Sequence, residues 1–272
     1  MQGINVTCLD ERFLDRASEL AKKLSLPLVT ALPERQLLSE NFQSAYQLEV
    51  TEQGLSLKPG YGSEYKHGPI VCSFTSGAND HRRKFGGGKG QDIAKAVGIT
   101  AKYRPSVVDL TAGLGTDSFV LSSLGCAVTM IERHPVVHSL LEDGLCRASE
   151  QAQSDSELGP ILDRLTLIDT DSRDYLDSLE EEHCPDVFYL DPMFPERKKS
   201  AKVKKEMQAF HEIVGADDDA SELLSKALEK PVCRIVVKRP AYAKQLAGLA
   251  PVYSIKGKST RFDIYPLKKL PT

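Results

Sequence analysis

The stretch Val107-Val108-Asp109-Leu110-Thr111-Ala112-Gly113-Leu114-Gly115-Thr116-Asp117, followed by Val128-Thr129-Met130-Ile131-Glu132, decides the fold. An apolar strand breaks at two glycines, a helix follows, and a second apolar strand ends in one acidic residue. Glycine permits a tight turn and lets a ligand approach the backbone closely. A carboxylate roughly twenty residues further on suits the two hydroxyls of a ribose. The pattern therefore predicts a pocket for a cofactor that contains adenosine.

The spacing of the glycines argues against a dinucleotide as that cofactor. A dinucleotide-binding fingerprint has a third small residue for close packing of helix and strand, and here Asp117 and Ser118 stand at that point. Asp117 would also repel a pyrophosphate at the start of the helix. S-adenosylmethionine (SAM) carries an amino group and a sulfonium instead, which tolerate nearby carboxylates. We therefore predict a SAM site with contacts from Asp109, Gly113, Gly115, Asp117 and Glu132.

Length and composition fit one large α/β domain with a small extra module. The chain has 272 residues, of which 41% are hydrophobic. No apolar run approaches the length of a membrane span, and the first residues lack a signal-peptide pattern. The six cysteines are scattered without the spacing of zinc ligands, so we expect free thiols in a reducing cytoplasm and no metal.

The chain is expected to divide near its glycine-rich segment. Residues 1–75 are predicted to form a small α+β module, with a strand, a helix, a short strand and a hairpin. Residues 76–104 are predicted to be a basic, glycine-rich linker and a helix. Residues 105–272 alternate strands with helices, which indicates a doubly wound, Rossmann-like parallel sheet. Strands at 252–255 and 261–265 are predicted to close that sheet as an antiparallel hairpin, the arrangement of SAM-dependent methyltransferases.

A second motif, Asp191-Pro192-Met193-Phe194-Pro195, follows the predicted fourth strand. Ligands of open α/β sheets sit at the carboxyl ends of the strands, so this loop is expected to face the cofactor. It resembles the Asp/Asn-Pro-Pro-Tyr/Phe loop of enzymes that methylate exocyclic amines of bases, with Met193 in place of the second proline. Hydrogen bonds to Asp191 and the Pro192 carbonyl would orient the amine, and Phe194 offers a face for an extruded base. A packing role is the alternative for Phe194.

Two basic clusters are candidates for binding nucleic acid. Arg82 and Arg83 lie in the first, beside the glycine-rich segment, and Lys198 and Lys199 lie in the second, just after the Asp191 loop. A solvated protein face is the alternative for either cluster. Because the net charge of the chain is −3, a basic rim suits a phosphate-bearing substrate that is held locally.

Five separated motifs occur in the order of one known family. They are DLTAGLGTD at 109–117, ERHPVV at 132–137, DPMFP at 191–195 with KSAKVKKEM at 199–207, VVKRP at 236–240 and RFDIY at 261–265. Together they resemble the bacterial ribosomal RNA small-subunit methyltransferase J family, over residues 85–265. The resemblance implies methylation of the N2 of a guanosine near the 3′ end of 16S rRNA, with the RNA or the small ribosomal subunit as partner. It also implies cofactor contacts at Thr116, Asp117, Glu132, Arg133, Asp171, Ser172 and Asp191.

Several of these assignments have alternatives. Asp171 could instead cap a helix, and Lys238, a candidate RNA-phosphate contact at the end of the fifth strand, could instead form an internal ion pair. A 2′-O-methyltransferase would use a lysine near the ribose, which Lys238 and Asp191 could imitate in part. A C5-pyrimidine methyltransferase needs a cysteine near Asp191, and none is present. A ribosome-assembly factor with a vestigial pocket is the non-enzymatic alternative.

Overall fold

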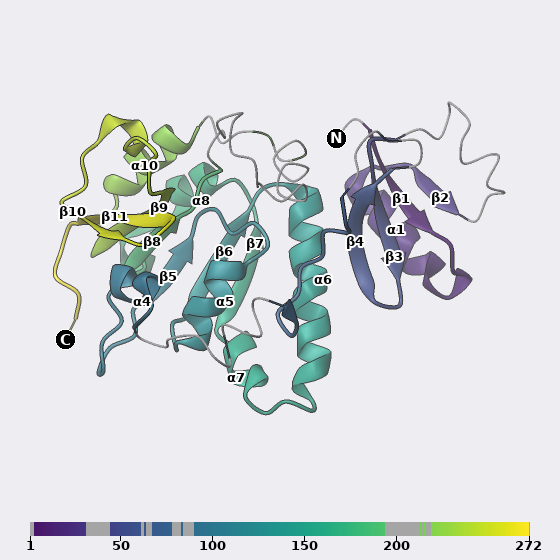
Figure 1. The fold of residues 1–272 in the computed structure, drawn as a ribbon, viewed down its shortest axis with the longest axis horizontal. Helices are drawn as coiled ribbons and strands as arrows, with labels where there is room; N and C mark the ends of the chain where they lie inside the picture. The colour runs from purple at the N-terminus through teal and green to yellow at the C-terminus, as the bar shows by residue number, and fades with distance from the viewer. Residues whose placement is uncertain are drawn as a thin grey trace. The chain divides into compact units, whose positions relative to one another are not determined.

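The computed structural model describes residues 3–30, 44–60, 63, 67–77, 83, 90–193, 213, 215 and 219–271. Within these residues the chain forms two compact units (Figure 1). The first takes in the described residues up to Cys72, Pro135–Arg147, and residues 213 and 215, and the second takes in the described residues of Ser73–His134, Ala148–Pro195 and Ala216–Thr272. The boundaries near residues 75 and 104 remain predictions. No helix among the described residues is long and apolar enough to cross a bilayer.

The first unit contains a four-stranded sheet, a helix packed on it, and residues Pro135–Arg147 of the long helix α6 (Pro135–Ala152). Its strands follow the order β2-β1-β3-β4, in which β1 runs parallel to both β2 and β3 while β3 and β4 form an antiparallel hairpin. Its elements are β1 (Ile4–Cys8), the 3-10 turn η1 (Glu11–Phe13), α1 (Leu14–Leu24), β2 (Leu28–Thr30), β3 (Tyr46–Thr51) and β4 (Gly54–Pro59). The helix expected over 10–24 begins as the 3-10 turn because Asp10 caps it by accepting from the Arg12 N–H.

The second unit is built on a seven-stranded sheet with the order β10-β11-β9-β8-β5-β6-β7. β7, β6, β5, β8 and β9 are parallel, and β11 lies antiparallel between β9 and β10. The strands are β5 (Val107–Asp109), β6 (Val128–Glu132), β7 (Leu165–Asp169), β8 (Val187–Leu190), β9 (Arg234–Pro240), β10 (Tyr253–Lys256) and β11 (Thr260–Pro266). The predicted doubly wound sheet with a closing hairpin is confirmed.

The helices of this unit follow from the strand order. The chain moves one way from β5 to β7 and then returns to place β8 and β9 on the other side of β5, so right-handed crossovers put the two sets of helices on opposite faces. α8 (Ser172–Ser178) and α10 (Ala220–Leu228) bury Leu176, Leu223 and Leu224 against one face of β5, β8 and β9. The remaining helical elements of this unit are α4 (Asp92–Val97), α5 (Thr116–Ser123), residues 148–152 at the end of α6, α7 (Leu158–Leu162), and the 3-10 turns η4 (Glu181–His183) and η5 (Leu246–Gly248).

The reversal of strand order falls between β5 and β8, and it positions the candidate site. At such a switch point the loops leaving two neighbouring strands turn to opposite faces, which opens a crevice at the carboxyl edge of the sheet. The glycine loop leaves β5 there, and the Asp191 loop leaves β8. The Asp191 N–H donates to Thr111 Oγ1 at 2.6 Å, so the two predicted motifs meet at this edge.

Strand β9 continues beyond Val237 as far as Pro240. Its pairing with β11 continues to Thr260 opposite Pro240, which keeps Lys238 and Arg239 inside the ladder. The sequence places two charged residues there, a pattern that normally ends a buried strand. Here Arg239 is buried and the Lys238 ammonium lies between carboxylates, so the strand continues.

Candidate cofactor and substrate site

The glycine loop after β5 has a backbone that only glycine adopts easily. Gly113 and Gly115 have φ values of 56° and 68°, and Gly115 caps the start of α5. A Cβ placed on Gly113 would meet no atom within 4 Å, so the backbone here borders open space. Thr116, the first residue of α5, is exposed. These features fit a loop that a ligand approaches closely.

Glu132, at the end of β6, is tied to this loop. Gly113 N–H donates to Glu132 Oε2 at 2.9 Å, and His134 N–H donates to Oε1 at 2.7 Å. The side chain is buried, and backbone N–H groups hold both of its carboxylate oxygens. The backbone therefore fixes the carboxylate beside the glycine turn, in the place expected of a ribose acceptor.

Asp109 lies deeper than the other predicted cofactor contacts. It is 2% exposed, and it accepts from the Thr111 N–H at 3.1 Å and from the Ser118 hydroxyl at 2.6 Å. Burial raises the pKa of Asp109 to about 7, although these hydrogen bonds act in the opposite direction. Asp109 thus joins the two ends of the glycine loop, and its direct contact with a cofactor stays a prediction.

A partly buried charge cluster lies at the carboxyl ends of β8 and β9. We call Lys238, Asp117, Asp191 and Tyr189 the Lys238 cluster. Lys238 Nζ donates to Asp117 Oδ2 at 2.7 Å and to Asp191 Oδ2 at 2.8 Å, and the Tyr189 hydroxyl donates to Asp117 Oδ2 at 2.7 Å. Asp117 is 11% exposed, whereas Asp191 keeps 38% of its side-chain surface. One carboxylate of the cluster is therefore open to solvent and the other is enclosed.

The charges in this cluster depend on one another. Burial raises the pKa of Asp191, Lys238 lowers it, and the negative charge of Asp117 raises it again, so the net direction is upward. Burial alone would lower the pKa of Lys238, but the attraction of Asp191 and Asp117 outweighs it and the net pKa is raised. Lys238 is thus held as a cation, and that cation favours the ionised form of Asp191. This geometry favours the internal ion pair over a phosphate contact for Lys238.

A second charge cluster joins the end of β6 to α8 and α10. We call Arg133, Asp171, Arg173 and Asp219 the Arg133 cluster. Asp171 accepts from the Arg173 N–H at 2.8 Å and so caps α8, the alternative considered for it. Arg133 pairs with Asp171 at 3.3 Å and with Asp219. Ser172 is buried and donates to the Leu110 carbonyl at 2.5 Å. Cofactor contacts by Arg133, Asp171 and Ser172 remain predictions.

Of the other predicted RNA-binding residues, only Arg83 falls within the described residues. Its side chain is 6% exposed and pairs with Asp155 at 2.8 Å, which favours an internal role. Arg82, Phe194, Lys198 and Lys199 lie outside the described residues. Pro192 is described and is buried directly after Asp191.

Sequence reasoning missed two residues of this site. In the sequence, Tyr189 resembles an ordinary core residue of a strand, and Ser118 resembles a small residue without a specific role in the first turn of a helix. Each donates to a buried carboxylate, Asp117 and Asp109 respectively. The sequence does contain one indication for Tyr189: its hydroxyl lies in an apolar strand that leads into an acidic motif, and a buried hydroxyl needs a hydrogen-bond partner.

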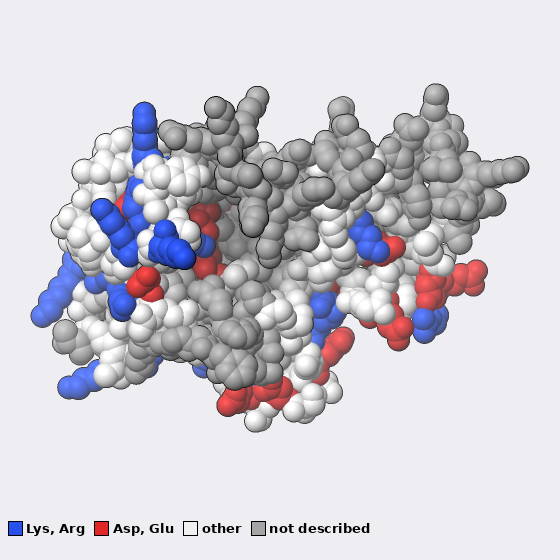
Figure 2. Space-filling view, viewed as in Figure 1, with Lys and Arg blue, Asp and Glu red and all other residues white. Residues whose placement is uncertain are grey.

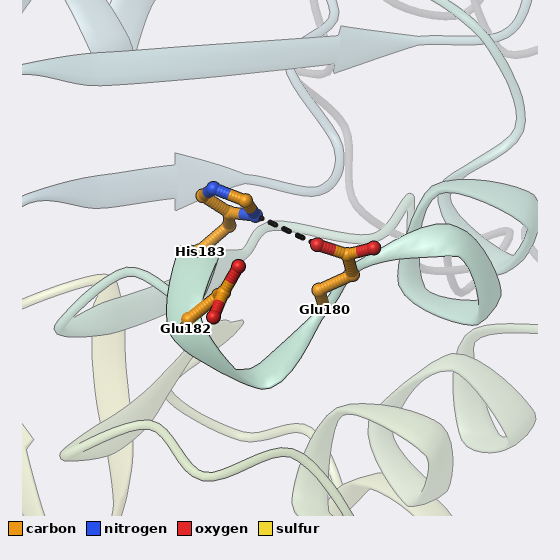
Figure 3. Close-up of side chains that lie close together, drawn as sticks. All are labelled: Glu180, Glu182 and His183. Atoms are coloured by element: carbon orange, nitrogen blue, oxygen red, sulfur yellow. Dashed lines mark ion pairs between the residues drawn. The ribbon is translucent and has the colours of Figure 1, made fainter.

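One exposed group among the described residues has the spacing of metal ligands. Glu180, Glu182 and His183 lie within reach of one ion, and His183 Nδ1 is 3.3 Å from Glu180 Oε2 (Figure 3). The group precedes β8 at the amino edge of the sheet, whereas Asp191 follows β8 at the carboxyl edge. Exposed acidic groups of this kind are common on protein surfaces, and this one is separate from the candidate site.

Comparisons with known proteins agree with this geometry. A family model described as "Putative SAM-dependent methyltransferase" matches residues 31–267. A protein of Cellvibrio japonicus named ribosomal RNA small subunit methyltransferase J is 50% identical, with all of both chains covered. A protein of the same name from Pseudomonas aeruginosa is 46% identical over 98% of this chain and 96% of its own.

A solved structure agrees as well. The crystal structure of a SAM-dependent methyltransferase from Neisseria gonorrhoeae is 36% identical, covers 96% of each chain and has a TM-score of 0.70. The predicted resemblance and the predicted cofactor class are thereby confirmed. The chain is a SAM-dependent methyltransferase and belongs to the ribosomal RNA small subunit methyltransferase J family.

Proposed function

We propose that this chain methylates the exocyclic N2 of a guanosine near the 3′ end of 16S rRNA, in the cytoplasm, on the RNA or the small ribosomal subunit. The names of its relatives support the RNA class. The observation that carries the proposal is the carboxylate of Asp191, 38% exposed at the switch point beside the glycine loop and held by Lys238 and by its own N–H on Thr111. A fixed acceptor beside a methyl donor suits a weakly nucleophilic amine.

The cofactor-binding residues of the proposal surround the glycine loop. The open space at Gly113 fits a close approach of SAM to the backbone, and the carboxylate of Glu132, held beside Gly113, fits the ribose. SAM supplies an electrophilic methyl group on its sulfonium when it is bound. The further contacts in the proposal are Asp109, Gly115, Thr116, Asp117, Arg133, Asp171 and Ser172.

The chain's own residues would then orient the amine. The Asp191 carboxylate and the Pro192 carbonyl accept its two N–H bonds, which directs the nitrogen lone pair away from them. Lys238 keeps Asp191 ionised and fixes the position of one of its oxygens. The ionised carboxylate can also receive the proton that the amine loses once it is methylated. Phe194, three residues beyond Asp191, stays a prediction as the stacking face for the base.

One experiment tests the proposal directly. Nucleosides of 16S rRNA from cells that lack this chain are analysed by mass spectrometry, and the cells are complemented with the wild-type chain or with Asp191→Asn. We expect N2-methylguanosine at one position to be missing, to return with the wild-type chain, and not to return with an equally abundant Asp191→Asn variant. An unchanged set of guanosine modifications would reject the substrate, and the loss of a ribose 2′-O-methyl group would favour that alternative instead.

The same experiment also separates the enzyme from an assembly factor. If the chain were an assembly factor with a vestigial pocket, the Asp191→Asn variant would support ribosome maturation as well as the wild-type chain does. Loss of the chain would then leave rRNA methylation unaltered. Methyl transfer from labelled SAM by the purified chain decides between the two alternatives.

A further inference from the structure

The connection that follows β9 is held by buried side chains. The Arg261 guanidinium, in a side chain that is 10% exposed, donates to the carbonyls of Ala241 at 3.1 Å and Ala243 at 2.6 Å. Arg239 donates to the Lys244 carbonyl at 3.3 Å, and the Tyr265 hydroxyl donates to the Leu249 carbonyl at 3.0 Å. Two arginines and a tyrosine of the core thus fix the backbone of residues 241–249.

This fixed backbone presents side chains that the core does not use. Tyr242 is 62% exposed, although its neighbours Ala243 and Leu246 are buried. Lys244 is exposed as well. Ala247 has a φ of 53°, a conformation that costs energy outside glycine and that often marks a functional segment. A large aromatic ring left in water on a rigid segment is a favourable platform for stacking.

The turn between β10 and β11 lies at the same edge of the sheet. Thr260 pairs with Pro240, and the Ala241 N–H donates to the Ser259 carbonyl at 2.9 Å, so the turn adjoins the connection after β9. Lys256 and Lys258 of this turn are exposed. We call Tyr242, Lys244, Lys256 and Lys258 the carboxyl-edge surface. Figure 2 shows Lys and Arg side chains over the C-terminal strands, at the left of the view.

The lysines of this surface carry positive charge that no ion pair within the described residues neutralises. No carboxylate in the described part of the chain forms an ion pair with Lys244, Lys256 or Lys258. Asp92 of α4 approaches the turn near Gly257, but its carboxylate pairs with Lys95 at 3.3 Å. The Lys238 ammonium, by contrast, is shared between two carboxylates. Lys244, Lys256 and Lys258 therefore offer a substrate positive charge that no described carboxylate neutralises in an ion pair.

The carboxyl-edge surface also lies on the strand next to the candidate catalytic group. β9 runs parallel to β8, with Val237 opposite Leu190, so the chain leaves both strands at one edge, at Asp191 and at Ala241. A polynucleotide whose base reaches Asp191 must extend its backbone over neighbouring loops. Lysines for phosphates and an aromatic face for an unpaired base are the groups that single-stranded RNA requires there.

We propose that Tyr242, Lys244, Lys256 and Lys258 bind the RNA strand that flanks the target nucleotide, with Tyr242 stacking on a base and the lysines contacting phosphates. The inference rests on the proposed RNA substrate. According to this inference, the phosphate contacts lie at the end of the sheet formed by β9, β11 and β10, and the cofactor lies at β5 and β6.

The test compares charge removal at opposite edges of one sheet. The double variant Lys256→Ser/Lys258→Ser is matched by Lys102→Ser/Lys269→Ser, which removes two exposed lysines at the amino edge, before β5 and after β11. Tyr242→Ala is matched by Tyr253→Ala, a tyrosine that is 44% exposed and pairs with Ile264 at the end of the hairpin away from its turn. Binding of naked 16S rRNA is measured at several salt concentrations, from about 50 to about 300 mM, along with methyl transfer to small subunits and binding of SAM.

We expect the carboxyl-edge variants to weaken RNA binding and to leave SAM binding unchanged. The lysine pair should reduce the slope of log K against log salt by about one for each phosphate that is no longer neutralised. Tyr242→Ala should weaken binding by roughly 5- to 100-fold with the salt slope unchanged, as expected when one base stack is removed. The amino-edge pair and Tyr253→Ala should match the wild-type chain.

Two results would overturn the inference. In the first, the carboxyl-edge variants bind RNA as tightly as their control variants do, although the wild-type chain methylates small subunits. The other is a defect on assembled subunits with normal binding of naked RNA, which would assign the surface to a ribosomal protein. Failure of the wild-type chain to methylate any small-subunit RNA would instead reject the proposed function, so the two failures are distinguishable.

Discussion

The two charge clusters at the carboxyl edge use the same residue types with opposite electrostatic results. In the Arg133 cluster, hydrogen bonds from Arg173 hold the pKa of Asp171 well below its usual range, and those from Arg133 lower the pKa of Asp219. In the Lys238 cluster, burial and Asp117 raise the pKa of Asp191 in spite of the lysine. The arginine partners keep Asp171 and Asp219 ionised, whereas Asp117 and Asp191 share one lysine, so the charge of Asp191 depends on both of these neighbours.

The difference matters because only the second arrangement can control a reaction. Asp171 and Asp219 stay ionised at any physiological pH, so the stability they give is present above their unfolded pKa values and is lost only as the pH falls through the low folded values. The pKa of Asp191 lies above its usual range, and Lys238 limits how far burial and Asp117 raise it. Substitutions in each cluster test this difference.

The largest effect is expected when Lys238 is replaced by methionine, which keeps the length of the side chain and removes its charge. Loss of Lys238 removes an influence that lowers the pKa of Asp191, while burial and Asp117 continue to raise it. The pKa of Asp191 should rise further, so a larger fraction of Asp191 is protonated at a given pH, and methyl transfer near pH 7 should fall by about 100-fold or more. Activity should recover as the pH rises, because only the ionised form accepts from the amine.

The pH profile of kcat separates this role from simple packing. The groups that act on Asp191 are Lys238, Asp117 and Arg239, so Lys238→Arg, which retains the charge, should keep the acidic limb of the profile near its wild-type position. An equal loss of activity by Lys238→Met across the whole profile, from acidic to alkaline pH, would show that Lys238 acts through packing alone.

The next effect concerns Glu132, which stands next to Arg133 in the chain but is buried. We expect Glu132→Ala to weaken SAM binding by about 10- to 100-fold, because hydrogen bonds to a charged acceptor contribute about 1–3 kcal/mol each. The variant also leaves the N–H groups of Gly113 and His134 without their acceptor. Calorimetric titration is therefore combined with thermal unfolding of the same sample. A lower Tm with unchanged SAM affinity would restrict Glu132 to supporting the glycine loop.

The two clusters also show which features of the fold and the site can be predicted from the sequence. The glycine pair, Glu132 and the strands could be predicted because turn chemistry and apolar runs are local, and the order of the parallel strands follows from crossover rules. The pairing of Lys238 with Asp117 spans 121 residues, and no spacing rule indicates which side chains meet there. The sequence could not reveal that Tyr189 donates to Asp117, since its hydroxyl sits in a strand that is otherwise apolar.

The smallest effect is expected in the Arg133 cluster itself. The Arg133 side chain is 35% exposed and that of Asp219 is 22% exposed, so solvent screens their attraction. A double-mutant cycle of Arg133→Ala and Asp219→Ala should give a coupling energy below about 1 kcal/mol that shrinks further at high salt. Arg133→Ala should weaken SAM binding by no more than about fivefold, because the guanidinium already has two carboxylate partners on α8 and α10. A loss as large as that of Glu132→Ala would place Arg133 in direct contact with the cofactor, and the fixed charges of this cluster would then belong to the site as fully as those around Lys238.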